Sequence, residues 1–258
     1  MRAKPYVGVT GCVTKPEVMN VLDKFSDAGY CGASHEPMTG FLVSYKTLNG
    51  RHTSNRRYPG ICRLPDLVKA SYAFNMVHYN SRELNTLAEQ VINIFNGIYP
   101  KCHALQLNIP WPDPRQLELI KNEFTDMEIV FQASRKVTAG KSAALIADCV
   151  AVYGDLVDYV LIDPSGGQGK PFDLERSLSI YSELRSRTPE LTIGFAGGFT
   201  GDNVAERLEL IIDRLGESSF CIDAEGGLRN KVTDAYGDDL LDIEKVGAYV
   251  HGSSRILR

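Results

Sequence analysis

The feature that most constrains the fold of this 258-residue chain is an alternation of short apolar runs with helical patterns, repeated eight times. Each apolar run is typical of a strand buried on both faces, as in parallel sheets, and apolar residues at helical spacing follow it. The predicted strands span residues 6–10, 41–45, 73–78, 104–107, 128–132, 159–162, 191–196 and 219–222. The predicted helices span residues 17–28, 64–71, 82–98, 114–124, 141–153, 177–187, 203–215 and about 241–249.

Eight successive strand–helix units predict a (β/α)₈ barrel, an α/β fold, as a single domain over residues 1–258. The alternative is an open, doubly wound sheet, which usually has fewer units. No repeat of fixed period accompanies the alternation, so the barrel is predicted from the order of elements alone.

Composition limits the classes of function. The net charge of −4 argues against general nucleic-acid binding, and no apolar run is long enough to cross a membrane. The six cysteines form no Cys-x-x-Cys pair and the five histidines are dispersed, so we expect no disulfide framework, metal site or other cofactor. With no apolar segment behind the basic N-terminus, reduced thiols in a cytoplasmic protein are expected.

In a barrel of this kind the chemistry lies where the strands end, at the C-terminal face. Polar residues and glycines are placed there throughout the sequence. They are Thr10, Gly11, Cys12, Lys46, His78, Asn80, Gln106, Asn108, Gln132, Arg135, Asp163, Gly197, Gly198, Asp223 and Glu225. For His78, a structural role competes with a role as ligand or base.

Asp163 ends the sixth predicted strand and opens a glycine-rich loop that includes Gly166 and Gly167. The position is typical of a catalytic carboxylate, although a tight turn with a helix-capping aspartate would leave the same pattern. Gly-Gly pairs also follow the next two strands, at Gly197-Gly198 and Gly226-Gly227. Backbone N–H groups in such loops, beside a helix N-terminus, predict a site for a phosphate or another anion. The alternative is that these glycines serve only as turn residues.

The last third of the chain resembles the phosphoribosylanthranilate isomerase family. That family has a strand-six aspartate followed by a Gly-Gly-x-Gly-Lys-x-Phe-Asp run, which corresponds to Asp163 and residues 166–173 here. Its Ala-Gly-Gly and Asn-Val in unit seven correspond to residues 196–198 and 203–204. Gln106 and Asn80 correspond to family positions in strands four and three.

The resemblance implies an Amadori-type aldose–ketose isomerisation of a phosphorylated or otherwise anionic sugar. Asp163 would be the general acid. The family's base is a cysteine that ends strand one, where this chain has Thr10 in the ungapped alignment and Cys12 two residues later. We take Cys12 as the candidate base.

The resemblance and the strand ends together give a set of candidate substrate-binding residues. They are Lys46, Arg57, Asn80, Gln106, Gly166, Gly167, Lys170, Gly197, Gly198, Asp223 and Glu225. The basic segment 46–57 is either a lid over an anionic substrate or a solvated loop. Two other functions remain open. One is a different sugar transformation that uses Asp163, Asp223 and Glu225, and the other is a barrel that binds a ligand without catalysis.

Overall fold

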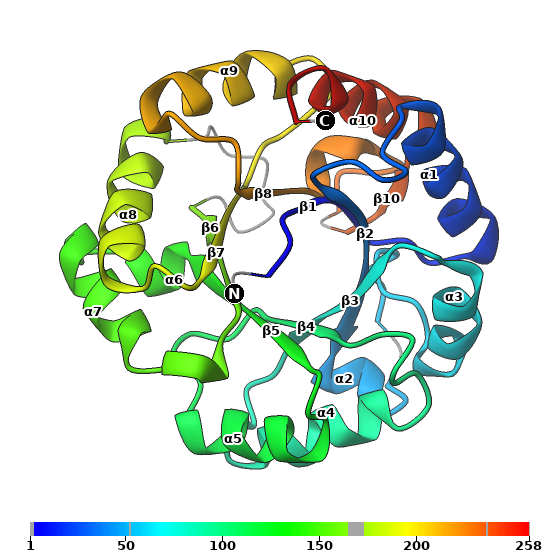
Figure 1. The fold of residues 1–258 in the computed structure, drawn as a ribbon. Helices are drawn as coiled ribbons and strands as arrows, with labels where there is room; N and C mark the ends of the chain where they lie inside the picture. The colour runs from blue at the N-terminus through cyan, green and yellow to red at the C-terminus, as the bar shows by residue number, and fades with distance from the viewer. Residues whose placement is uncertain (1–2, 52, 165–172, 236, 258) are drawn as a thin grey trace.

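The structure is a computed structural model that describes residues 3–51, 53–164, 173–235 and 237–257. Eight parallel strands follow one another around a closed barrel, and β1 (Tyr6–Thr10) pairs with β8 (Cys221–Ala224) to close it. Helices surround the barrel when it is viewed along its axis (Figure 1). The predicted (β/α)₈ fold is confirmed.

The remaining barrel strands are β2 (Glu36–Ser44), β3 (Phe74–Asn80), β4 (Ala104–Leu107), β5 (Glu128–Ser134), β6 (Tyr159–Asp163) and β7 (Thr192–Ala196). The longer helices are α1 (Lys15–Asp27), α3 (Leu64–Ala70), α4 (Leu87–Phe95), α5 (Pro114–Glu123), α7 (Ala143–Ala151), α8 (Leu174–Arg187), α9 (Val204–Leu215) and α10 (Ile243–Leu257). The short turns of helix include α2 (Tyr45–Leu48) and α6 (Arg135–Thr138).

Local sequence sets the ends of these helices. At the start of α1, Thr14 and Glu17 form a capping box in which each side chain accepts a hydrogen bond from the other residue's backbone N–H. At the end of α9, Gly216 adopts the left-handed conformation (φ 69°) that side chains disfavour.

Two apolar cores lie on the two faces of the barrel wall. The outer one packs the strands against the helices, and the inner one fills the barrel. The inner core consists of Tyr6, Met38, Phe74, Met76, Ala104, Val130, Tyr159, Leu161, Ala196 and Cys221. Side chains on a strand alternate between faces, so the residue two positions further along points inward again. After Met76, Ala104, Val130, Leu161 and Cys221 that residue is polar, which gives the barrel an apolar interior with a polar layer at its C-terminal end.

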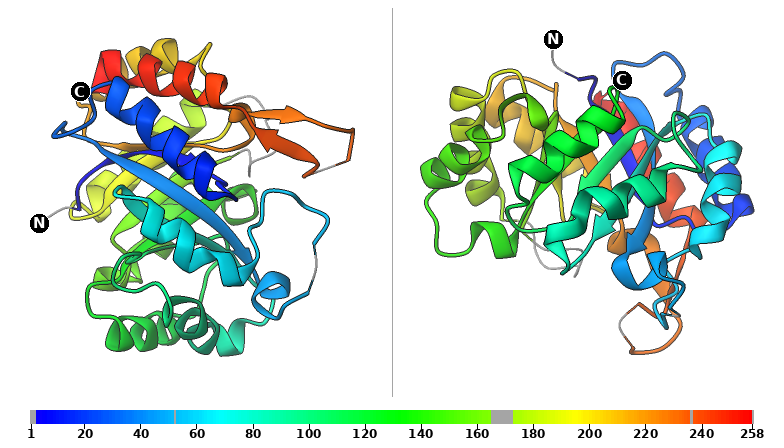
Figure 2. Two further views of the ribbon diagram at one scale, coloured as in Figure 1. Left: turned by 90° about the vertical axis from the view of Figure 1, so that its right-hand side faces the viewer. Right: turned by 90° about the horizontal axis from the view of Figure 1, so that it is seen from below.

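A hairpin interrupts the last unit. Strands β9 (Arg229–Lys231) and β10 (Asp239–Leu241) pair antiparallel between β8 and α10. Figure 2 shows the hairpin standing out from the C-terminal end of the barrel, beside the segment that follows α2. The two are joined by a hydrogen bond from the Arg56 N–H to the Gly237 carbonyl, 2.9 Å long. One side of the barrel mouth is therefore walled by two insertions.

The predicted boundaries differ most at β2, α4, the hairpin and α10. Helix α4 spans Leu87–Phe95, shorter at both ends than the predicted 82–98. Strand β2 begins at Glu36, five residues before the predicted start at 41. Its first half contains Pro37 and Gly40, which usually mark strand breaks. The hairpin was not predicted, because its strands are only three residues long, too short for a strand pattern, and β9 is entirely polar. Helix α10 continues to Leu257, well beyond the predicted end near 249.

Candidate active site

Six polar side chains from six strands form the polar layer at the C-terminal end of the barrel. They are Thr10, His78, Gln106, Gln132, Asp163 and Asp223, and all six are buried. Buried polar groups are costly unless they are hydrogen-bonded, so a layer of this kind indicates a site whose function requires them. Asp163 and Asp223 lie at the same rim, as predicted, because β6 and β8 run parallel in one closed sheet.

Thr10 joins two of the other strands. Its hydroxyl lies 2.9 Å and 3.1 Å from the two carboxylate oxygens of Asp223, and it donates to them. The same oxygen lies 3.3 Å from Nε2 of His78. A chain of three side chains thus crosses the barrel interior from β3 through β1 to β8.

Two glycines make room for this chain. A Cβ on Gly40 would lie 2.4 Å from the Thr10 hydroxyl oxygen and 2.8 Å from His78 Nε2. A Cβ on Gly8 would lie 2.7 Å from an oxygen of Asp223. Side chains at these positions would force the polar layer to rearrange, so the need for glycine here comes from close packing.

We expect Gly40→Ala to destabilise the fold by about 1–3 kcal/mol, the usual cost of overpacking a filled interior. Urea unfolding measures the effect. Gly60→Ala is the matched control, because the added Cβ would approach only the sulfur of Cys62 at an ordinary 3.7 Å. Equal unfolding midpoints for the two variants would contradict the packing described around Gly40.

The carboxyl group of Asp223 has an unusual pKa. Burial raises the pKa of its carboxyl to about 7, the hydrogen bond from Thr10 opposes that rise, and the charges of Glu225 and Asp163 add to it. A carboxylate with a pKa near neutrality is a stronger base than an ordinary one and is still substantially ionised at pH 7. Asp163, in turn, accepts a 2.6 Å hydrogen bond from Nε2 of Gln132.

The pKa of His78 is shifted in the opposite direction to that of Asp223. Burial lowers the pKa of its imidazole to about 3, so the ring is neutral at physiological pH. A neutral imidazole carries one N–H and one acceptor nitrogen. His78 is therefore suited to hydrogen bonding and unsuited to carrying positive charge for an anion.

Amide side chains extend the layer over β3 and β4. Gln106 donates from Nε2 to Oδ1 of Asn108 at 2.9 Å, while its own Oε1 has no partner among the described residues. Asn80, half-buried, donates to the hydroxyl of Tyr58 at 3.0 Å. These groups offer hydrogen-bond donors and acceptors of the kind that recognise sugar hydroxyls.

Cys12 lies outside this layer. Its side chain is fully buried in the outer core, between the strands and the helices. Burial, helped by the charge of Glu17 and opposed by that of Arg229, raises the pKa of the thiol to about 12. A thiol with that pKa is not ionised at neutral pH. The strand-one side chain that reaches the interior is Thr10, so the geometry disfavours Cys12 as base.

Arg57 is held by carboxylates of the protein. Its Nε lies 2.9 Å from Oδ1 of Asp239, and its Nη1 lies 2.7 Å from Oε1 of Glu225. The hairpin residue Arg229 lies 3.6 Å from the same Asp239 and donates to the Gly11 carbonyl at 2.6 Å. This ion-pair cluster fixes the segment after α2 to the hairpin, which gives Arg57 and Glu225 a structural role. Lys46 is exposed in α2.

The glycine loops are only partly described. Gly166, Gly167 and Lys170 lie outside the described residues. In the loop after β7, Nη1 of Arg207 donates to the Gly198 carbonyl at 2.7 Å and contacts that of Gly197 at 3.3 Å. A Cβ on Gly227 would lie 2.1 Å from the carbonyl oxygen of Phe199, so this glycine lets loops seven and eight pack together.

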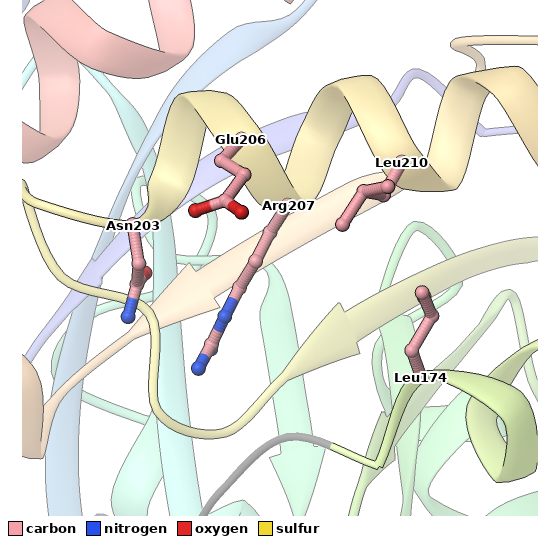
Figure 3. Close-up of a pocket in the computed structure, with 5 residues that line it drawn as sticks. All are labelled: Leu174, Asn203, Glu206, Arg207 and Leu210. Carbon is pink, nitrogen blue, oxygen red and sulfur yellow. The ribbon is translucent and has the colours of Figure 1, made fainter.

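A cavity of about 300 Å³ lies beside the β7 loop, between α8 and α9. Its lining residues are Leu174, Asn203, Glu206, Arg207 and Leu210 (Figure 3). Figure 3 shows the Arg207 side chain extending from α9 towards the loop that follows β7. The anion site predicted at Gly197 and Gly198 therefore has an arginine beside it, although that guanidinium already hydrogen-bonds the glycine carbonyls.

The described residues contain neither a candidate metal-ligand cluster nor a membrane-spanning helix. No group of three or more His, Cys, Asp or Glu side chains there is arranged to hold a metal ion. Within the same residues, no helix combines the length and apolar character needed to span a membrane.

The chain matches no protein-family model and no curated protein sequence. Its structure is similar to that of N-(5'-phosphoribosyl)anthranilate isomerase from Pyrococcus furiosus, with a TM-score of 0.62 and 16% identity over 98% of this chain and 100% of that one. The phosphoribosylanthranilate isomerase from Thermotoga maritima gives a TM-score of 0.62 and 12% identity, over 97% of this chain and 99% of that one. The catalytic domain of a chitinase from Pyrococcus furiosus also gives a TM-score of 0.62, with 13% identity over 99% of this chain and 97% of that one. At these identities the shared property is the (β/α)₈ fold.

The structure adds three residues that the sequence did not single out for the site. Tyr58, Arg229 and Asp239 lie in the two insertions. Thr10 was among the predicted strand-end residues, but its hydrogen bond to Asp223 was not predicted. An Arg-rich segment facing an Asp-rich one offered a charge signal for the pairing of Arg57 with Asp239. No sequence pattern indicated which carboxylate would pair with which arginine.

Proposed function

We propose that this protein is an enzyme that isomerises an anionic, sugar-type substrate between aldose and ketose forms, with Asp163 as general acid and Asp223 as general base. The observation that carries the proposal is the buried Asp223 carboxyl, whose pKa is about 7 and which shares a rim with Asp163. General acid–base catalysis works best with groups whose pKa values lie near the working pH.

The chemistry assigns one task to each carboxyl group. Asp163 protonates the ring oxygen of a glycosylamine, the C1–O bond breaks, and the nitrogen lone pair forms an iminium. Asp223 then removes the proton from C2, and the C2–H electrons form a C1=C2 double bond while the nitrogen regains its lone pair. Tautomerisation moves a proton to C1 and leaves a ketone at C2. Atoms and charge balance without an oxidant or a metal.

Three features support this assignment over the alternatives. The sequence around Asp163 resembles that of an isomerase family whose strand-six aspartate is the acid. Glu225 is paired with Arg57 at 2.7 Å, which disfavours its use as a third catalytic carboxylate. Gln106 and Asn80 supply uncharged polar groups for substrate hydroxyls. Anion binding rests on the glycine loops and is part of the same proposal.

The test is a panel of N-substituted pentosylamines, each with and without a 5-phosphate, followed by NMR for conversion to the 1-amino-ketose. We expect conversion of a phosphorylated member and weaker conversion of its unphosphorylated partner. Calorimetry on the same panel separates binding from turnover. Tight binding of a phosphorylated member with no turnover would instead favour the non-catalytic barrel.

A further inference from the structure

We propose that His78 and Thr10 form a directed hydrogen-bond chain that holds Asp223 ready to accept a proton, so that both act as positioning residues. The part of this inference that concerns catalysis rests on the proposed role of Asp223 as base. The direction of the chain and its effect on Asp223 do not depend on any substrate.

The direction follows from counting protons. An ionised Asp223 has only acceptor atoms, and both of its oxygens lie within 3.1 Å of the Thr10 hydroxyl. The single hydroxyl proton of Thr10 must then point at Asp223. Its oxygen can only accept from His78, which lies 3.3 Å away, so the imidazole proton is on Nε2.

The surroundings of His78 support the same arrangement. Burial keeps its pKa far below neutrality, so the ring stays neutral and donates from one nitrogen only. Gly40 on β2 leaves the space in which Thr10 and His78 meet, since a Cβ there would overlap both. The chain is thus built by three strands, and only Thr10 within it touches the carboxylate.

The other groups that face Asp223 make the Thr10 donor important. Asp163 from β6 and Glu225 beyond β8 raise the pKa of Asp223 when they are ionised. Tyr6, Cys221 and Tyr249 also face it, and burial raises the pKa of each well above its usual value, so they are uncharged at neutral pH. Thr10 opposes these influences by hydrogen-bonding the ionised form, which favours that form.

The place of Thr10 on strand one bears on which strand supplies the base. Thr10 occupies the strand-one position at which the resemblance places a cysteine base, and here it donates to a carboxylate from strand eight. In the proposed reaction the proton acceptor is a residue of strand eight, and strand one supplies a supporting hydrogen bond. The reacting proton would leave C2 towards Asp223, and Thr10 would stay protonated throughout.

The experiment is a carboxyl ¹³C NMR titration of aspartate-labelled protein without substrate, with the Asp223 signal assigned from Asp223→Asn. Thr10→Val keeps the shape of the side chain and removes the donor, so we expect the Asp223 pKa to rise by about one to two pH units, the worth of a hydrogen bond to a charged group. Thr10→Ser keeps the donor and should titrate like the wild type. An unchanged Asp223 titration in Thr10→Val would overturn the proposal.

Activity gives a second readout with a defined sign. Because a base acts when ionised, the rising limb of kcat against pH should move to higher pH in Thr10→Val by the same amount. The loss is then roughly tenfold at pH 7, recovered at high pH, with KM little changed. If the Asp223 pKa rises in Thr10→Val but the wild type turns over no substrate, the hydrogen-bond chain is supported and the proposed reaction is refuted. Normal turnover in Thr10→Val with an unchanged Asp223 titration would refute the hydrogen-bond chain and support the proposed reaction.

A measurement on the wild type covers the case in which Thr10→Val does not fold. Imidazole ¹⁵N NMR should show His78 neutral, with its proton on Nε2, from pH 8 to pH 9, where the Asp223 carboxyl is ionised. A proton on Nδ1, or protonation of the ring within that range, would overturn the directed chain.

Discussion

Replacing Asp163 by Asn should lower kcat by about 10²–10⁴-fold while leaving substrate affinity close to that of the wild type. The amide has the size of the carboxyl group, and its oxygen can still accept the 2.6 Å hydrogen bond from Gln132. What it lacks is a transferable proton for the ring oxygen. Steady-state kinetics and calorimetry on the two proteins separate the loss of proton transfer from any loss of binding.

Cys12→Ala is the control for this prediction. The thiol is buried in the outer core with a pKa of about 12, so its removal should change kcat by less than about threefold at neutral pH. A loss at Cys12 comparable to that at Asp163 would restore the cysteine as base. Full activity in Asp163→Asn would remove Asp163 from the mechanism.

Replacing Arg57 by Met should destabilise the fold by about 3–5 kcal/mol, the usual cost of removing one partner of a buried ion pair. The side chains of Arg57 and Asp239 are only 7% and 9% exposed, and Glu225 lies on the other side of the guanidinium. The substitution would leave two carboxylates at the barrel mouth without this cation. Urea unfolding at pH 7 gives the free-energy change.

Two further variants sharpen the test. Arg214→Met removes a salt bridge to Glu175 whose side chains are 54% and 70% exposed, so its unfolding midpoint should stay near that of the wild type. Adding Glu225→Gln to Arg57→Met removes one stranded carboxylate, leaves Asp239 for Arg229, and should recover part of the loss. If Arg57→Met is as mild as Arg214→Met, the insertions are not held together by this cluster.

The sequence predicted the barrel because eight short apolar runs alternate with helical patterns along the chain. The bounds of β1 and β4 are those predicted, since apolar residues make up most of both strands. At β2 the apolar run was only the second half of the strand. Gly40 there carries no side chain because Thr10 and His78 occupy the space, a tertiary reason that no local pattern reveals.

The site could be predicted only in outline. The rule that chemistry lies at strand ends located Asp163, Asp223, Gln106 and His78 in one layer. It could not tell that Thr10 faces the interior and Cys12 the outer core, because residues just beyond a strand end no longer follow the alternation. Arg57 was predicted at the substrate, but its partner Asp239 comes from a hairpin whose strands are too short to leave a sequence pattern.

The most direct test of the proton-transfer centre is deuterium incorporation at C2 of a phosphorylated pentosylamine in D₂O, followed by proton NMR for the wild type and Asp223→Asn. The account predicts exchange in the wild type with a rate that rises through pH 7, as the Asp223 carboxyl ionises, and its loss in the variant. Exchange that is undiminished in Asp223→Asn, or a wild type that binds the compound and exchanges nothing, would contradict it.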